Sequence, residues 1–99
     1  MMTSAQRQSL QSRLRDFHSQ AEKELQTYYG IDKQLHDLIK KQEVGESAMR
    51  VYSHMIVPNQ ETIRAREEQL KKLEKQISLL DNAKVETMSD EEFQHYINS

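Results

Sequence analysis

Histidine and carboxylate side chains are the groups in this sequence that could bind a metal ion or transfer a proton. The four histidines are His18, His36, His54 and His95. A metal site needs several such ligands close together, and di-iron bundles carry a Glu-x-x-His pair on each of two helices. Such pairs do not occur on two predicted helices, and His36 and His54 are about 27 Å apart if one helix joins them. We therefore predict surface histidines and no metal site.

Catalysis by a nucleophile or on a bound phosphate also lacks its usual residues. The chain has no cysteine, only two glycines and no Gly-x-Ser-x-Gly sequence, so the turns that present a nucleophile or hold a phosphate are missing. Its carboxylates lie instead at helical spacing from basic residues, as in Glu67 with Lys71, which is typical of a solvated helix surface. We expect no catalytic residue, no cofactor and no small-molecule substrate, and hence a protein that is not an enzyme.

The composition restricts the class of partner. The 99 residues are 35% hydrophobic and 30% charged, with a net charge of -2, whereas nucleic acids and anionic membranes bind cationic surfaces. No apolar run approaches the roughly 20 residues of a membrane span, and residues 1–10 lack the apolar core of a signal peptide. The absence of cysteine fits a reducing compartment. We expect a protein partner, no nucleic acid, no membrane insertion and a cytoplasmic location.

Apolar residues recur at heptad spacing in three successive segments, which predicts the helices that must position these side chains. The three series are Leu10, Leu14, Phe17, Ala21, Leu25 and Tyr28; Ile31, Leu35, Leu38, Met49, Tyr52 and Ile56; and Ile63, Leu70, Leu73, Ile77 and Leu80. Helices joined by short turns pack antiparallel. We therefore predict an all-α fold in one domain over residues 1–99, an antiparallel three-helix bundle or coiled coil with a short C-terminal fourth helix.

Capping and turn residues predict where these helices begin and end. Thr3 or Ser4 caps the first helix, Gly30 ends it, and Pro58 ends the second, because the residue before a proline is disfavoured in a helix. Ser89, followed by a glutamate three residues later, forms a capping box for the last helix. The predicted helices cover residues 4–28, 31–56, 59–81 and 90–97.

The predicted second helix has a weak centre at Gln42 and Gly45. Both positions fall on the heptad series but bury little, and a glycine inside a helix costs about 1 kcal/mol relative to alanine. In one interpretation the helix continues from residue 31 to 56, with another helix close to Gly45 or a register-setting polar contact from Gln42. In the other it breaks here and Glu46 begins a new helix. The heptad phase matches on both sides, which favours continuity.

The candidate interaction residues lie beside this weak centre and in the last helix. Residues 49–57 are the most apolar stretch of the chain, and the last helix is too short to be stable in water unless its apolar face docks on a surface. The candidates are Gln42, Gly45, Met49, Tyr52, Met55, Phe93, Tyr96 and Ile97. For the tyrosines there is a second interpretation, in which they cap the core with their hydroxyls in water.

The same region carries two resemblances to known families. Lys-Lys-Gln-Glu at residues 40–43, an apolar helix ending at Pro58 and Ile-Arg at residues 63–64 together resemble the corner between the second and third helices of tubulin-binding cofactor A. Tyr52, followed by an apolar run and a heptad helix, is similar to the corresponding feature of prefoldin subunits. Neither resemblance assigns a functional residue in this sequence.

Two functions from different classes fit the predicted fold. A thin core with polar residues predicts a marginally stable monomer, for which association is the usual remedy. Our first hypothesis is therefore a non-enzymatic helical protein-protein interaction subunit or adaptor, which assembles with itself or with another helical chain. The alternative is a small monomeric helical chaperone or cofactor that clasps a client protein. A concentration series in sedimentation distinguishes the two, and an enzyme built from scattered Arg and Glu residues ranks third.

Overall fold

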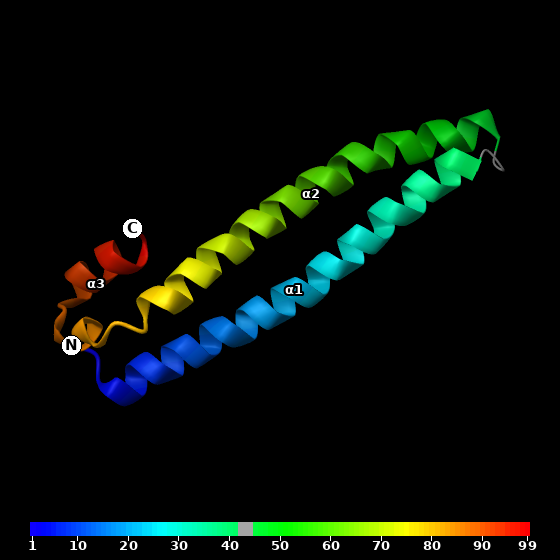
Figure 1. Cartoon of the computed structure of the whole chain (residues 1–99). Coiled ribbons are helices and arrows are strands. Elements are labelled where there is room, and N and C mark those ends of the chain that lie inside the picture. Colours follow the sequence, from blue (N-terminus) through cyan, green and yellow to red (C-terminus); the bar gives the residue numbers. More distant parts are fainter. Residues whose placement is uncertain (42–44) are drawn as a thin grey trace. The chain divides into compact units, whose positions relative to one another are not determined.

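The computed structural model describes residues 1–41 and 45–99, which form helices and no strand (Figure 1). Its elements are α1 (Ser4–Lys41), α2 (Glu46–Leu79), a 3-10 helix η1 (Ala83–Thr87) and α3 (Asp90–Ile97). The all-α class and the short helix at residues 90–97 are confirmed. The prediction of three long helices is wrong, because the described residues contain two, and the short C-terminal helix is the third α-helix and not the fourth.

Gly30 lies inside α1, so the predicted helix end at this residue is wrong. Its backbone is outside the left-handed region, and a Cβ added there would meet nothing within 4 Å. Glycine permits a turn without requiring one. The packing of α1 against α2 offsets the roughly 1 kcal/mol that a helical glycine costs.

Pro58 lies inside α2, and the predicted helix boundary there is also wrong. Proline lacks an N–H, so the helix loses its hydrogen bond to the carbonyl of His54. Contacts just beyond the proline hold the helix against α1: Asn59 Nδ2 donates to the Tyr28 carbonyl at 3.1 Å, and Ile63 is buried. Here tertiary contacts override the local preference of the chain.

α1 ends at Lys41 and α2 begins at Glu46. Gly45 lies outside both helices, and its carbonyl accepts the N–H of Met49 at 3.0 Å, which makes it the N-cap of α2. The alternative in which Glu46 begins a new helix is therefore confirmed, and the continuous helix over residues 31–56 is wrong. Within the described chain no helix approaches Gly45 closely, because a Cβ added there would meet nothing within 4 Å. The contact predicted for Gln42 lies outside the described residues.

The described chain divides into two compact units. Unit 1 comprises Met1–Gln20 and Gln69–Ser99, and unit 2 comprises Ala21–Glu68. In each unit a segment of α1 lies antiparallel to a segment of α2 (Figure 1). A single-domain organisation over residues 1–99 stays a prediction.

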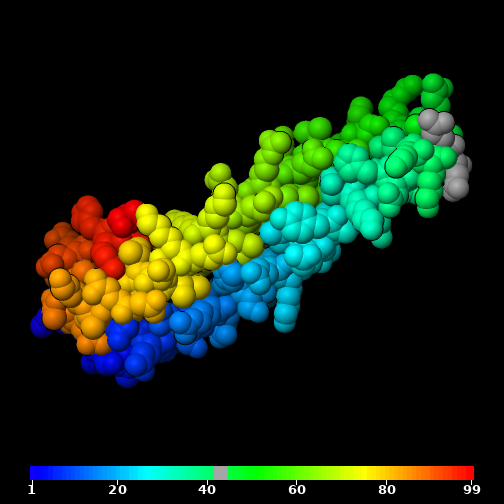
Figure 2. All heavy atoms as spheres, in the orientation of Figure 1, coloured from blue at the N-terminus to red at the C-terminus, as the bar shows by residue number. Residues whose placement is uncertain are grey.

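The core of unit 1 includes an element that the sequence did not predict. Its buried residues are Gln11, Leu70, Leu80 and Val85. Val85 belongs to η1, whose N-cap Asn82 accepts the N–H of Lys84 through its side chain at 3.0 Å. Figure 2 shows the orange and red atoms of residues 83–99 against the yellow end of α2 and the blue start of α1.

Side chains also cap both α-helices that begin in unit 1. At the start of α1, Thr3 Oγ1 accepts the N–H of Gln6 at 3.1 Å and Gln6 Oε1 accepts the N–H of Thr3 at 2.9 Å. At the start of α3, Ser89 Oγ accepts the N–H of Glu92 at 3.2 Å. The cap predicted at Ser89 is thus confirmed, and Thr3 is the cap of the first helix.

The core of unit 2 is small and purely apolar. Its buried residues are Ala21, Leu25, Leu35 and Ile63, all of which belong to the predicted heptad series. The series is wrong for Phe17 in unit 1, whose exposed fraction is 61%. A single partner helix covers a narrower stripe than the two neighbours of a three-helix bundle, so residues at the margin of the series remain in solvent.

Candidate protein interface

The C-terminal end of α2 is held in unit 1 by polar side chains of α1. The last carbonyls of a helix lack partners within the helix. Gln11 Nε2 donates to the Ile77 carbonyl at 2.8 Å and to Asp81 Oδ1 at 2.6 Å. Arg7 Nη1 donates to the Leu80 carbonyl at 2.7 Å, and its guanidinium places a positive charge at the negative end of the helix dipole.

The candidate residues of α3 lie against the chain itself. Phe93, Tyr96 and Ile97 are half-buried, and the Tyr96 hydroxyl donates to the Leu79 carbonyl at 2.9 Å. The surface on which this short helix docks is thus the end of α2 in the same unit. Binding of a partner by these three residues stays a prediction.

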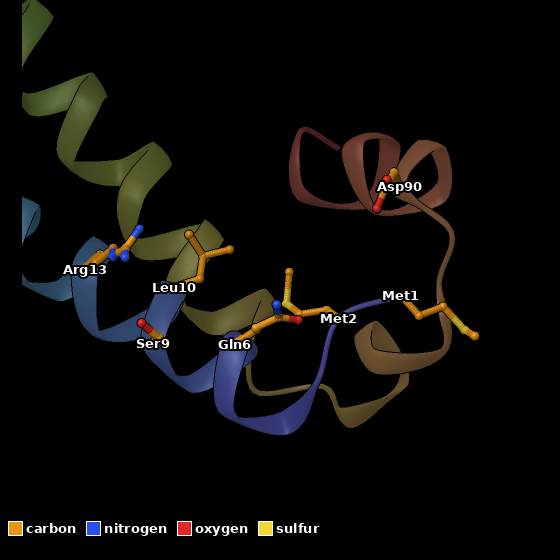
Figure 3. A pocket seen from close by; sticks show the side chains of 7 residues that line it. All are labelled: Met1, Met2, Gln6, Ser9, Leu10, Arg13 and Asp90. Carbon is orange, nitrogen blue, oxygen red and sulfur yellow. The ribbon is translucent and has the colours of Figure 1, made fainter.

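A pocket of ≈ 610 Å³ lies in unit 1 beside the N-terminus. It is lined by Met1, Met2, Gln6, Ser9, Leu10, Arg13 and Asp90. Figure 3 shows its two charged residues, Arg13 and Asp90, at opposite ends of the lining. These groups do not converge on one point, so the geometry of this pocket gives no argument for catalysis.

The polar contacts between the helices of unit 2 fall within residues 24–32 and 59–67. Arg66 Nη1 donates to Glu24 Oε2 at 3.0 Å, and its guanidinium carbon lies 5.9 Å from the centroid of the Tyr28 ring. Among the described residues, 33–41 and 46–58 make no hydrogen bond or ion pair with each other. Association of the helices there therefore depends on apolar packing.

That apolar packing is incomplete. No described residue between 36 and 62 is buried, although this part of the chain contains its most apolar stretch. Large apolar side chains are exposed between residues 36 and 62, namely Leu38, Val51, Met55 and Val57. Tyr29, earlier in α1, is exposed as well. Incompletely covered apolar residues that gather in one region are typical of interaction sites.

Four residues of α2 form a stripe on one face of the helix. Val51, Met55, Pro58 and Thr62 are spaced by four, three and four, which places them within about 60° of one another around the axis. Three of these four residues also line a groove of ≈ 420 Å³ in unit 2. The groove is lined by Ile31 and Leu35 of α1 and by His54, Met55, Pro58, Asn59 and Thr62 of α2. We call these residues together with Val51 the apolar groove.

The sequence located this region better than it located its individual residues. Met55, a predicted candidate, is 48% exposed and lies in the apolar groove. Met49 and Tyr52 are half-buried, and Gly45 caps the helix. The binding role predicted for Met49, Tyr52 and Gly45 stays a prediction. The groove also includes Pro58, which sequence reasoning had assigned to a helix end.

Tyr29 of α1 lies on the surface of unit 2. Desolvation, followed by the charge of Glu67 and a hydrogen bond with it, raises the pKa of the Tyr29 hydroxyl. This tyrosine therefore keeps its proton at neutral pH. Its ring offers apolar area and a hydrogen-bond donor, which are properties common at protein interfaces.

Comparison with known protein families, with characterised proteins and with solved structures finds no match for this chain. Within residues 1–41 and 45–99, no helix combines the length and apolarity that crossing a bilayer requires. The surface of the chain itself therefore provides the observations that bear on function.

Proposed function

We propose that this protein is a non-enzymatic helical interaction module that binds a helical partner in the apolar groove of unit 2. The observation that supports this most directly is the exposure of the most apolar stretch of the chain. Val51 and Met55 are 58% and 48% exposed on one face of α2, and Met55 lines the groove together with Ile31 and Leu35 of α1.

A helix fits this groove better than an extended strand does. The groove lies between two helices, and its lining residues recur along each at steps of three or four, as in Ile31 and Leu35 of α1 and Met55, Pro58 and Thr62 of α2. A partner helix can therefore place its own ridge between them. A bound helix would complete a small helical bundle with α1 and α2. Burial of the stripe would supply the apolar area that the unit lacks in its own core.

Two valines of α2 allow a matched test of this proposal. Val51 and Val57 have almost equal exposed fractions, 58% and 57%. They lie about 120° apart around the helix because six residues correspond to about 600° of rotation. Val51 belongs to the stripe and Val57 does not, so Val51→Glu should remove binding whereas Val57→Glu should leave it intact.

The measurement combines a sedimentation concentration series with capture of partners by the wild type and both variants. Circular dichroism shows that each variant is still helical. Association that is lost only in Val51→Glu supports the interaction module, either as a self-assembling subunit or as a monomer that clasps a client in a one-to-one complex. Equal behaviour of the two variants, or no association in either measurement, would contradict it.

A further inference from the structure

We propose that the occupant of the apolar groove is α2 of a second copy of this chain, which packs antiparallel across a two-fold axis. This inference rests on the proposed function and names the partner. Its basis is the placement of two charged residues, Arg50 and Glu61, beside the stripe of Val51, Met55, Pro58 and Thr62.

Arg50 and Glu61 lie on the same flank of the stripe. Relative to Val51 they are rotated by about 100° and about 80° in the same direction around α2. Both are exposed, and neither forms an ion pair with another residue of the described chain. They are eleven positions apart in the sequence, about 16 Å along the axis, so they are too far apart to pair within one helix.

An antiparallel copy brings these charges together. If Met55 packs against Pro58 of the second copy, Val51 lies opposite Thr62 and the stripe is complementary to itself. Arg50 then lies about two residues, or about 3 Å along the axis, from Glu61 of the other copy. A two-fold axis perpendicular to both helices keeps the same flank of each on one side of the interface, so the contact occurs twice.

The two-fold arrangement also determines on which side of the α2 pair the two copies of α1 lie. The stripe of α2 borders Ile31 and Leu35 of α1 on the flank opposite Arg50 and Glu61. The two copies of α1 would therefore lie on one side of the α2 pair and cover it, while the ion pairs close the other side. The interface then has an apolar centre and a charged rim, as stable interfaces do.

Charge reversal tests this register. Arg50→Glu alone and Glu61→Arg alone each turn two attractions into two repulsions, and should raise the dimer dissociation constant about tenfold. The double variant Arg50→Glu/Glu61→Arg restores both pairs and should dimerise like the wild type. An equimolar mixture of the two single variants should form a heterodimer, because one chain then carries two acidic and the other two basic flank residues. Lys33→Glu, at an exposed position of α1 that lies about 160° around the helix from both Ile31 and Leu35, is the control and should leave the constant unchanged.

Sedimentation equilibrium of each variant and of the mixture gives the outcomes. Weakened single variants with recovery in the double variant and in the mixture support the antiparallel dimer. A wild-type dimer that is indifferent to these reversals overturns the proposed register. A monomer at all concentrations that still captures a protein partner through Val51 overturns the second copy and leaves the proposed function standing. A monomer that captures nothing in a Val51-dependent way overturns both.

Discussion

In unit 1 polar side chains of α1 donate hydrogen bonds to the terminal carbonyls of α2. In unit 2, residues 33–41 of α1 and 46–58 of α2 meet by apolar packing without such bonds among the described residues. Gln11 is buried in unit 1 and makes two hydrogen bonds across the helix pair. The corresponding amide in unit 2, that of Gln60, is half-buried and donates once, to Asp32 Oδ1 at 3.3 Å.

This difference separates a region that completes its own contacts from one that does not. In unit 1 the helix end has internal partners, and η1 and α3 cover it. In unit 2, apolar residues from 49 to 57 have no such cover among the described residues. Burial of an exposed apolar surface releases free energy, so the largest gain in binding free energy is expected for a partner that covers this surface.

The largest difference is expected for leucine truncations in the two units. Leu80 is fully buried in unit 1, and Leu80→Ala should reduce the free energy of unfolding by about 2–5 kcal/mol. Leu38 of unit 2 is exposed, and Leu38→Ala should cost about 1 kcal/mol or less. Urea unfolding at low protein concentration measures both. Equal losses would show that the two units are equally well packed.

The next test compares the two glutamines. Gln11→Ala removes a buried donor and leaves the Ile77 carbonyl without this partner, at a cost of about 1–3 kcal/mol. Gln60→Ala loses one long hydrogen bond at a partly exposed site and should cost less than about 1 kcal/mol. The same unfolding measurement applies to both. A larger loss for Gln60→Ala would reverse the contrast between the units.

The sequence predicted the class of the fold and part of the core from short-range periodicity. Leu25, Leu35, Ile63 and Leu70 are buried as the heptad spacing required, and Ser89 caps α3. These features depend on neighbours within a few residues, which a single sequence contains. The same reasoning identified the apolar stretch that borders the groove.

The topology could not be predicted in this way, because it depends on contacts distant in sequence. Gly30 and Pro58 are local signals for a helix end, yet contacts such as the one from Asn59 to Tyr28 make the helices continue through them. Val85 is buried because η1 packs into the core of unit 1, and no periodicity in the sequence predicts that packing. For η1 the available signal was Asn82, a common N-cap residue, three positions before Val85.

Helix caps offer a smaller test of the contrast between the units. The N-terminus of α3 in unit 1 is capped by the Ser89 side chain, which Ser89→Ala removes at a cost of about 1 kcal/mol. Ser89→Thr keeps a hydroxyl acceptor and serves as the control. Hydrogen exchange of the Glu92 amide, the donor to Ser89, reports the effect locally. Unchanged protection of this amide in Ser89→Ala would show that the cap contributes nothing to α3.

The smallest expected effects are those of the two glycines, and they have opposite signs. Both sites have open space where a Cβ would be added, so sterics do not decide the result. Gly30 lies inside α1, and Gly30→Ala should stabilise the protein by up to about 1 kcal/mol because alanine is the better helix former.

Gly45 is the N-cap of α2, a position at which glycine is tolerated and alanine is not favoured. Gly45→Ala should therefore destabilise by about 0.5 kcal/mol, and Gly45→Ser, which supplies a capping hydroxyl, should stabilise by a few tenths of a kcal/mol. Thermal unfolding followed by circular dichroism compares the three variants. If Gly45→Ala were instead stabilising to the same extent as Gly30→Ala, residue 45 would behave as a helix interior and the boundary between α1 and α2 would be wrong. The expected order, Gly30→Ala above wild type and Gly45→Ala below it, corresponds to a helix that continues through residue 30 and to a second helix that begins after residue 45.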